Sequence, residues 1–153
     1  MSQKILVVDD DLEILEMLYD ALNDEGYLVY KASNSFEARS QLKVNPDLMI
    51  LDVMMPGQDG FEFCKEIRSV VSCPIIFLTA KVSESDLIQG FAIGGDDYLT
   101  KPFSLRELRA RVAAHLRRNE RQSSREQSFL IFQHLKINLQ SRTVLYFDEC
   151  VPL

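Results

Sequence analysis

Five short apolar runs, separated by stretches with helical periodicity, constrain the fold of this chain more than any other feature of its sequence. The runs cover residues 5–8, 28–30, 48–51, 74–78 and 98–100. A short run that is apolar throughout is typical of a strand buried on both faces. Strands that alternate with helices predict an α/β fold: a doubly wound five-stranded parallel sheet with helices on both faces.

The predicted helices lie between these runs and have recognisable ends. They cover roughly residues 12–22, 35–44, 61–68, 84–93 and 104–116. Gly26 ends the first helix, and Asn45 with Pro46 breaks the second. Ser104 and Glu107 have the spacing of a capping box that opens the last helix.

Charged and hydroxyl side chains directly follow four of the predicted strands. Asp9, Asp10 and Asp11 follow the first strand, Asp52 the third, Thr79 the fourth and Lys101 the fifth. Sites in doubly wound sheets form beyond the carboxyl ends of the strands, so we expect these groups to gather at one edge. Neighbouring carboxylates repel each other, and a hard divalent cation with oxygen ligands relieves that repulsion. Mg²⁺ fits, because it binds one or two carboxylates together with phosphate and water.

This combination of groups suits phosphoryl transfer to a carboxylate. An aspartate attacks phosphorus, the cation neutralises the developing charge, and Lys101 and Thr79 hold phosphoryl oxygens. Each residue alone has a simpler interpretation: Asp11 as a helix N-cap, Asp52 as a turn carboxylate, Lys101 as a solvated lysine. Their joint placement at one sheet edge favours the site.

Two other sets of residues have structural interpretations. Gly57 and Gly60 are predicted to be turn residues. His115 lies near the apolar stripe of the last helix and is interpreted as structural.

The composition excludes several classes of function. The chain has 17 basic and 23 acidic residues, a net charge of −6, and therefore lacks the basic surface of a nucleic-acid-binding protein. No run approaches the roughly 18 apolar residues of a membrane span, and charges follow the first apolar run too soon for a signal peptide. The three cysteines, Cys64, Cys73 and Cys150, match no metal-binding spacing. We therefore expect a cytoplasmic protein without membrane partners.

The last quarter of the chain, from residue 117 on, differs from the rest. Residues 117–128 contain four arginines and no apolar residue, so we expect a frayed helix end and then a linker over residues 119–128. Beyond it, residues 129–132, 135–139 and 143–147 have the pattern of strands, the last two flanking residues 140–142 as in a β-hairpin. A C-terminal β-hairpin fragment over residues 129–153 is therefore predicted.

Taken in order, these segments resemble a bacterial response regulator receiver domain over residues 4–118. The matching segments are Ile-Leu-Val-Val-Asp-Asp-Asp (5–11), Leu-Asp-Val-Met-Met-Pro-Gly (51–57), Asp59 with Gly60, Phe-Leu-Thr-Ala (77–80) and Gly-Gly-Asp-Asp-Tyr-Leu-Thr-Lys-Pro-Phe (94–103). The resemblance implies a flavodoxin-like sheet with strand order 2-1-3-4-5 and a receiver domain over residues 1–118.

The same resemblance implies a role for each site residue. Asp52 would be the phosphoacceptor for a sensor histidine kinase, with Thr79 and Lys101 contacting the phosphoryl oxygens. Asp9, Asp10, Asp52 and the backbone carbonyl of Met54 would bind Mg²⁺. Thr79 and Tyr98 would report phosphorylation to the face formed by the fourth helix, fifth strand and fifth helix. The Lys101–Pro102 bond would be cis.

Residues 96–98, 101–103 and 106–111 resemble the OmpR/PhoB group of transcription factors, which carry a C-terminal winged helix. Residues 129–153 resemble the small sheet that opens that domain. The recognition helix and wing of the group would follow Leu153. We therefore expect a chain truncated before them, which contacts DNA only through that further region.

The OmpR/PhoB resemblance also implies a homodimer on phosphorylation. Asp97 and Arg111 match one charged pair of the family's dimer face, and Glu107 and Arg118 each match half of another. Their usual partners fall at Leu87 and Ile93. We expect a face that is more apolar and less sensitive to salt than in the family, because exposed ion pairs contribute only about 0–1 kcal/mol each.

Three other classes compete with this interpretation. A stand-alone receiver that acts only through protein contacts has no need of residues 129–153. A flavodoxin needs a phosphate-binding loop after the first strand, where three aspartates would repel phosphate. An aspartate-nucleophile phosphatase needs a second carboxylate at the position of Met54. We therefore expect a phosphoacceptor that catalyses only its own phosphorylation and dephosphorylation, not a conventional enzyme.

Overall fold

The computed structural model describes residues 2–80, 88, 92 and 94–120. In chain order its elements are β1 (Lys4–Val8), α1 (Leu12–Asp24), β2 (Leu28–Ala32), α2 (Ser35–Gln41), a 3₁₀ turn (Leu42–Val44), β3 (Leu48–Asp52), α3 (Gly60–Ile67), β4 (Ile75–Thr79) and β5 (Asp97–Thr100). Residues 105–120 form a further helix, called helix 105–120 here. Most of the predicted helix at 84–93, with Leu87 and Ile93, and the predicted hairpin at 129–153 lie outside the described residues.

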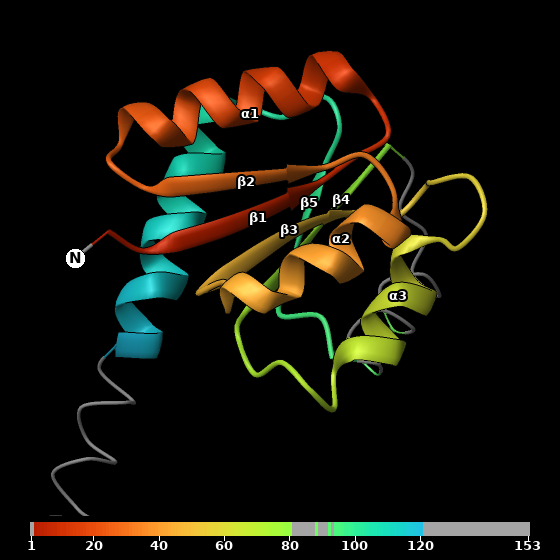
Figure 1. The fold of residues 1–153 in the computed structure, drawn as a ribbon. Helices are drawn as coiled ribbons and strands as arrows, with labels where there is room; N and C mark the ends of the chain where they lie inside the picture. Colours follow the sequence, from red (N-terminus) through yellow and green to blue (C-terminus); the bar gives the residue numbers. More distant parts are fainter. Residues whose placement is uncertain (1, 81–87, 89–91, 93, 121–153) are drawn as a thin grey trace, which may run out of the picture. The chain divides into compact units, whose positions relative to one another are not determined.

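The five strands form one sheet in the order β2-β1-β3-β4-β5, with every neighbouring pair parallel (Figure 1). This confirms the predicted doubly wound fold and its strand order. In the register, Asp52 of β3 lies opposite Leu78 of β4, and Thr79 lies opposite Thr100 of β5. The carboxyl ends of β3, β4 and β5 therefore meet at one edge, as expected from the sequence.

Helices cover both faces of the sheet. The side chains of α2 and α3 pack on one face in a core that includes Ala38, Phe63 and Phe77. On the other face, α1 and helix 105–120 pack in a second core that includes Leu18 and Leu108 (Figure 1). Because both faces are covered, β3 and β4 are buried along their whole length, which explains their uninterrupted apolar runs.

The N-termini of α1 and α3 are capped by aspartates. Asp11 accepts hydrogen bonds from the backbone N–H groups of Glu13 (3.0 Å) and Ile14 (3.4 Å), which confirms its interpretation as an N-cap. Asp59 and Glu62 form a reciprocal capping box at α3 that the sequence analysis did not identify. These caps fix where the loops after β1 and β3 enter their helices.

Other element ends differ slightly from the prediction. The second helix is α-helical only to Gln41 and continues as a 3₁₀ turn, because Asn45 adopts a left-handed conformation (φ 56°) directly before Pro46. At the last helix, Ser104 Oγ accepts the Glu107 N–H at 3.2 Å, as a capping box requires, while the Glu107 carboxylate accepts hydrogen bonds from Arg111.

The first compact unit of the structure covers Met1–Leu116. Residues 119 and 120, which we assigned to the linker, are still helical. Within the described residues, no helix is both long enough and apolar enough to cross a bilayer.

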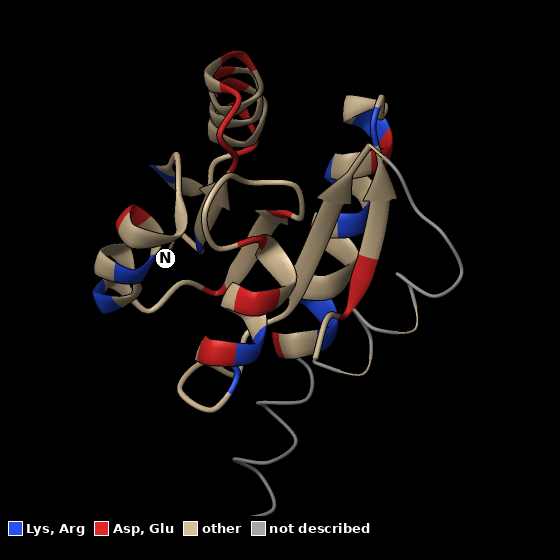
Figure 2. Ribbon diagram, turned by 90° about the vertical axis from the view of Figure 1, so that its right-hand side faces the viewer, with Lys and Arg blue, Asp and Glu red and all other residues tan. Residues whose placement is uncertain are grey.

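Charge is distributed unevenly over the helices of this unit. Helix α1, at the top of Figure 2, carries four acidic and no basic side chains. Helix 105–120 is rich in arginine, and Arg109 Nε lies 3.9 Å from Glu25 Oε2 at the end of α1. Because the contact is long and Glu25 is exposed, this ion pair contributes little to stability.

Candidate functional site

Asp52 is the last residue of β3 and lies at the carboxyl edge of the sheet. Its side chain is only 2% exposed. The next residue, Val53, continues the sheet by donating its N–H to the Leu78 carbonyl at 3.0 Å, and Met54 N–H donates to Asp52 Oδ1 at 3.3 Å. The buried strand and the first residues after it therefore hold this carboxylate in one position.

Two further carboxylates lie beside Asp52. Asp9, directly after β1, is fully buried, and its Oδ1 accepts the Asp11 N–H at 2.9 Å. Asp10 is exposed. One oxygen from each of Asp9, Asp10 and Asp52 lies within 4.8 Å of the other two. The structure thus brings together the three carboxylates that the strand-end pattern predicted.

Lys101 supplies the positive charge of the site. Its Nζ lies 3.0 Å from Asp9 Oδ2 and 3.3 Å from Asp52 Oδ1. Its backbone N–H donates to the Thr79 carbonyl at 2.7 Å, which ties the end of β5 to the end of β4. The Lys101–Pro102 bond is cis, as the resemblance implied. The predicted lysine therefore lies in the site and not in solvent.

The electrostatics of the site reflect three buried charges held close together. Burial and repulsion from Asp9 raise the pKa of Asp52 to about 7, although Lys101 opposes the shift. Burial alone would lower the pKa of Lys101, but its contacts with Asp9 and Asp52 outweigh this effect and raise it. The carboxylates thus carry more negative charge than one lysine can balance.

The donor set fits a divalent cation. Asp9 Oδ2 is buried and lies 3.0 Å from Lys101 Nζ, its ion-pair partner. The carboxylate oxygens of three aspartates, all within 4.8 Å of one another, are the hard oxygen ligands that Mg²⁺ prefers. Asp9, Asp10 and Asp52 are therefore suited to hold such an ion.

The two predicted switch residues lie on the adjacent strands β4 and β5. Thr79 ends β4 and is 2% exposed. Tyr98 of β5 is half-buried, and its ring centroid lies 5.4 Å from that of Phe77 and 6.3 Å from that of Phe61. The tyrosine ring thus packs against the core on the α3 side of the sheet.

A family model described as the response regulator receiver domain matches residues 5–113 of the chain. The chain belongs to this family. It is therefore a receiver domain of a two-component system, and receiver domains act as phosphoacceptors and not as ordinary enzymes. They usually bind Mg²⁺ at an aspartate cluster such as the one described above, and they interact with phosphodonors such as histidine kinases.

Solved structures of other receivers agree with this assignment. A putative response regulator from Chloroflexus aurantiacus is 42% identical, with a TM-score of 0.70, over 76% of this chain and 98% of that chain. The chemotaxis protein CheY4 of Vibrio cholerae is 34% identical, with a TM-score of 0.72, over 75% of this chain and 99% of that one. The BeF3-activated N-terminal receiver domain of Klebsiella pneumoniae RstA is 32% identical, with a TM-score of 0.71, over 75% of this chain and 99% of that chain.

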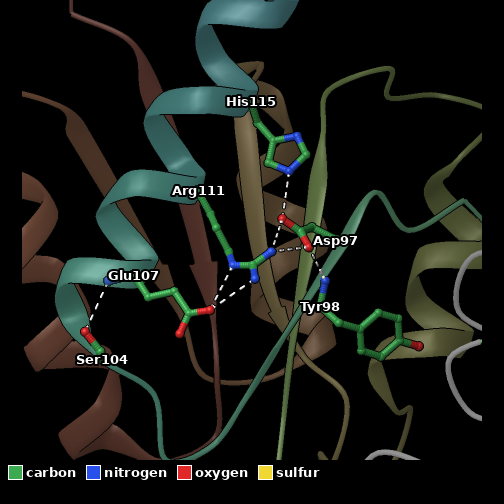
Figure 3. Close-up of polar contacts among 6 residues, drawn as sticks. All are labelled: Asp97, Tyr98, Ser104, Glu107, Arg111 and His115. Atoms are coloured by element: carbon green, nitrogen blue, oxygen red, sulfur yellow. Dashed lines mark hydrogen bonds and ion pairs between the residues drawn. The ribbon is translucent and has the colours of Figure 1, made fainter. Parts of the chain in front are cut away.

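In this receiver, Asp97 of β5 is the centre of a polar network with helix 105–120 (Figure 3). Arg111 Nη1 donates to both oxygens of Asp97, at 2.8 and 3.0 Å, and His115 Nε2 lies 3.0 Å from Asp97 Oδ2. The remaining Arg111 nitrogens contact Glu107 Oε2 at 3.3 and 3.0 Å. Asp97 and Arg111, which the resemblance placed in a pair between two chains, are thus joined within one chain.

These contacts keep Asp97 ionised. Burial raises its pKa, but hydrogen bonds from His115, Arg111 and the Tyr98 N–H outweigh burial and lower the pKa below its ordinary value of 3.8. Since an ionised carboxylate only accepts, His115 Nε2 carries the proton in its contact with Asp97. His115 is buried, which agrees with its interpretation as a structural residue. Its role is polar, because it forms a hydrogen bond with Asp97 of β5.

We expect Asp97→Asn to destabilise the protein by about 2 kcal/mol at pH 7, because the variant leaves Arg111 and His115 without their shared anion. The lowered pKa of Asp97 means that its contribution is complete above pH 3.8 and is lost as the pH falls through the folded-state pKa. Urea unfolding at several pH values measures this. Glu107→Gln, at the exposed end of the same network, should cost less than about 0.5 kcal/mol. Equal stabilities of wild type and Asp97→Asn at pH 7 would contradict the assignment.

Gly60, the first residue of α3, lies close to the backbone of Asp52 and Val53. A Cβ atom on Gly60 would lie 2.3 Å from the Asp52 carbonyl oxygen and 2.9 Å from Val53 Cα. The prediction that Gly60 is a turn residue is therefore wrong. Gly60 begins helix α3, and it leaves room for the backbone of Asp52 and Val53. The same prediction for Gly57 is confirmed by its φ of 80°.

The structure describes four of the six residues predicted for the dimer face. Asp97, Glu107 and Arg111 form the intrachain network of Figure 3, and Arg118 is exposed. Leu87 and Ile93 lie outside the described residues. The intermolecular role of this face stays a prediction.

Proposed function

We propose that Asp52 is the residue that accepts the phosphoryl group, from a sensor histidine kinase in the cytoplasm. The observation that supports this most strongly is a buried carboxylate at the carboxyl edge of the sheet, 3.3 Å from Lys101 Nζ and beside Asp9 and Asp10. The raised pKa of Asp52 reflects a carboxylate with little solvation, and a poorly solvated carboxylate is a better nucleophile.

The transfer forms one bond and breaks another. An Asp52 oxygen bonds to phosphorus while the bond from phosphorus to the donor's nitrogen or oxygen breaks, and the electron pair leaves with the donor. Lys101 Nζ, already within reach of Asp52 and Asp9, donates to a phosphoryl oxygen once the group is attached. The Thr79 hydroxyl, at the end of the adjacent strand, is the second donor. Both groups stabilise negative charge that develops during transfer.

Mg²⁺, held by Asp9, Asp10, Asp52 and the Met54 carbonyl, would neutralise the charge that the carboxylates and the phosphoryl oxygens share. Without such an ion, an incoming phosphoryl group would meet three carboxylates and a single lysine. The three carboxylates, gathered within 4.8 Å of one another, support this assignment.

The proposed output is a change in the surface formed by the fourth helix, β5 and helix 105–120. Thr79 and Tyr98 would transmit it, and their places on adjacent parallel strands support this role. From the resemblance of residues 96–111 to the OmpR/PhoB group, we infer a transcriptional output through a homodimer on this face. The intrachain ion pairs of Arg111 support a dimer with less dependence on charge, because that guanidinium is already satisfied within one chain.

A stand-alone receiver that acts only through protein contacts is the second candidate. The similarity to the chemotaxis protein CheY4, of which 99% is covered, favours it. The two candidates share the same chemistry at Asp52 and differ in the partner of the output surface.

The proposal is tested by adding acetyl phosphate and Mg²⁺ to the whole chain and reading its intact mass. We expect the gain of one phosphoryl group, located at Asp52 by peptide mapping, and no gain when Mg²⁺ is removed with a chelator. A phosphoryl group on any other residue, or the same yield without Mg²⁺, would contradict the proposal.

A further inference from the structure

Three polar side chains on α2, on α3 and on the loop that follows Asp52 form a closed set of hydrogen bonds. Arg39 of α2 donates from Nε to Glu66 Oε2 at 2.8 Å and from Nη2 to Glu66 Oε1 at 3.0 Å. Arg39 Nη2 also donates to Gln58 Oε1 at 2.8 Å, and Gln58 Nε2 donates to Glu66 Oε1 at 2.7 Å. Each member therefore contacts both others, and we call this set the Arg39–Gln58–Glu66 cluster.

The geometry of the cluster is better than that of an ordinary surface ion pair. Single exposed pairs contribute about 0–1 kcal/mol, but bidentate arginine–carboxylate pairs and networks contribute more. The Arg39 guanidinium also lies over the ring of Phe63, with its carbon 5.7 Å from the ring centroid. Since Phe63 is fully buried in α3, the guanidinium rests on a rigid surface.

The cluster joins α2 to the loop 53–59 and to α3, across 19 and 27 residues of sequence. Arg39 comes from α2 and Glu66 from α3, while Gln58 comes from the loop 53–59, which connects Asp52 to α3. Two hydrogen bonds hold the start of this loop. The Met54 N–H donates to Asp52 Oδ1 at 3.3 Å, and the Gly60 N–H donates to the Val53 carbonyl at 2.9 Å. The Gln58 side chain fixes the loop at its opposite end to two helices.

We propose that the Arg39–Gln58–Glu66 cluster positions the loop 53–59 for metal binding and phosphoryl transfer at Asp52. We call the three members of the cluster positioning residues. Their side-chain hydrogen bonds are with one another and not with Asp52. This inference rests on the proposed function of Asp52 and of the adjacent metal ligands. The loop carries Met54, whose backbone carbonyl is the ligand least constrained by a strand.

The physical reason is preorganisation. A loop that already has its bound conformation loses less conformational entropy when it binds an ion, so binding is tighter. Removing the side chain of Gln58 frees the loop from both helices at once. We expect Gln58→Ala to weaken Mg²⁺ binding by about 3- to 10-fold, which is comparable to the entropic cost of ordering at most about one loop residue.

The experiment compares four forms of the whole chain: wild type, Gln58→Ala, Arg39→Lys and, as the matched control, Glu16→Gln. The control removes an exposed ion pair, with Lys31, that does not involve the loop. Arg39→Lys keeps the charge but cannot make the bidentate contact with Glu66. The measurements are amide hydrogen exchange of peptides covering residues 53–59 without metal, Mg²⁺ affinity by calorimetry, and thermal unfolding.

We expect faster exchange in residues 53–59 for Gln58→Ala, a smaller effect for Arg39→Lys, and none for Glu16→Gln. Mg²⁺ affinity should fall in the same order, while the unfolding temperatures of Gln58→Ala and the control stay similar. Loop exchange and Mg²⁺ affinity that match wild type in both cluster variants would overturn the inference.

The outcome is separable from that of the proposed function. Wild-type protein that neither binds Mg²⁺ nor gains a phosphoryl group would contradict the function of Asp52. The metal-free exchange measurement would still decide whether the cluster holds the loop. Normal phosphorylation of wild type with unchanged loop exchange in the variants would instead refute the positioning role alone.

Discussion

Asp52→Asn protein is expected to accept no phosphoryl group and, in the absence of Mg²⁺, to be more stable than wild type above pH 7. The loss of phosphorylation follows from the removal of the nucleophilic oxygen. The gain in stability follows from the surroundings of Asp52, which is buried and close to the Asp9 carboxylate. An amide of the same shape removes the repulsion between the two carboxylates and the cost of burying one charge.

The dependence on pH has a definite sign. The pKa of Asp52 is raised from 3.8 to about 7, so the folded state holds this proton more tightly than the unfolded state. Wild type therefore loses stability as the pH rises from about 4 to about 7, while Asp52→Asn does not. At about 1.4 kcal/mol per pKa unit, the shift corresponds to an upper value of about 4 kcal/mol, and we expect a difference of about 2–4 kcal/mol at pH 8.

Urea unfolding in a chelator at pH 4, 6 and 8 measures this difference. The stabilisation should be small at pH 4 and largest at pH 8. Asp20→Asn, an exposed aspartate on α1, is the control and should change the free energy of unfolding by less than about 0.5 kcal/mol at each pH. Asp52→Asn protein that is less stable than wild type at pH 8, or that still gains a phosphoryl group, would refute the assignment.

Gly60→Ala is expected to destabilise the protein by about 3 kcal/mol or more and to impair phosphorylation of Asp52. The added Cβ would meet the Asp52 carbonyl oxygen at 2.3 Å and Val53 Cα at 2.9 Å. Both are backbone atoms of the segment that ends β3, so they cannot rotate away as a side chain could. Relief of the contact requires α3 to move away from β3, the strand that carries Asp52.

Gly26→Ala is the matched control for this steric effect. Gly26 has a φ of 95°, but nothing lies within 4 Å of an added Cβ, so its substitution carries only conformational strain, about 1 kcal/mol. Denaturant unfolding and the rate of phosphorylation by acetyl phosphate compare the two variants. Equal destabilisation by both substitutions would show that the contact with Asp52 relaxes without cost.

Much of the fold could be predicted because its signals are local. Each strand is a run of apolar residues buried on both faces, and each helix has its own periodicity and stop residues, so neighbouring residues in the sequence contain the information. The parallel arrangement then places the strand ends at one edge. For this reason Asp9, Asp10, Asp52, Thr79 and Lys101 could be assembled into a site before any contact was known.

The ends of elements were predicted less well, because tertiary contacts decide them. The second helix tightens into a 3₁₀ turn before Asn45, and helix 105–120 continues into the predicted linker. The capping box of Asp59 and Glu62 was present in the sequence, three residues apart, but was not identified.

The sequence by itself determined the class of fold, the order of its elements and the residues at the sheet edge. Only the tertiary structure decided how those residues are coupled: the burial that raises the pKa of Asp52, the joining of Asp97 to Arg111 and His115, and the Arg39–Gln58–Glu66 cluster. The side chains in these hydrogen bonds lie 8 to 27 residues apart in the sequence, and the pKa of Asp52 depends on its burial. No periodicity in the sequence relates them, because they meet only where helices pack on the finished sheet.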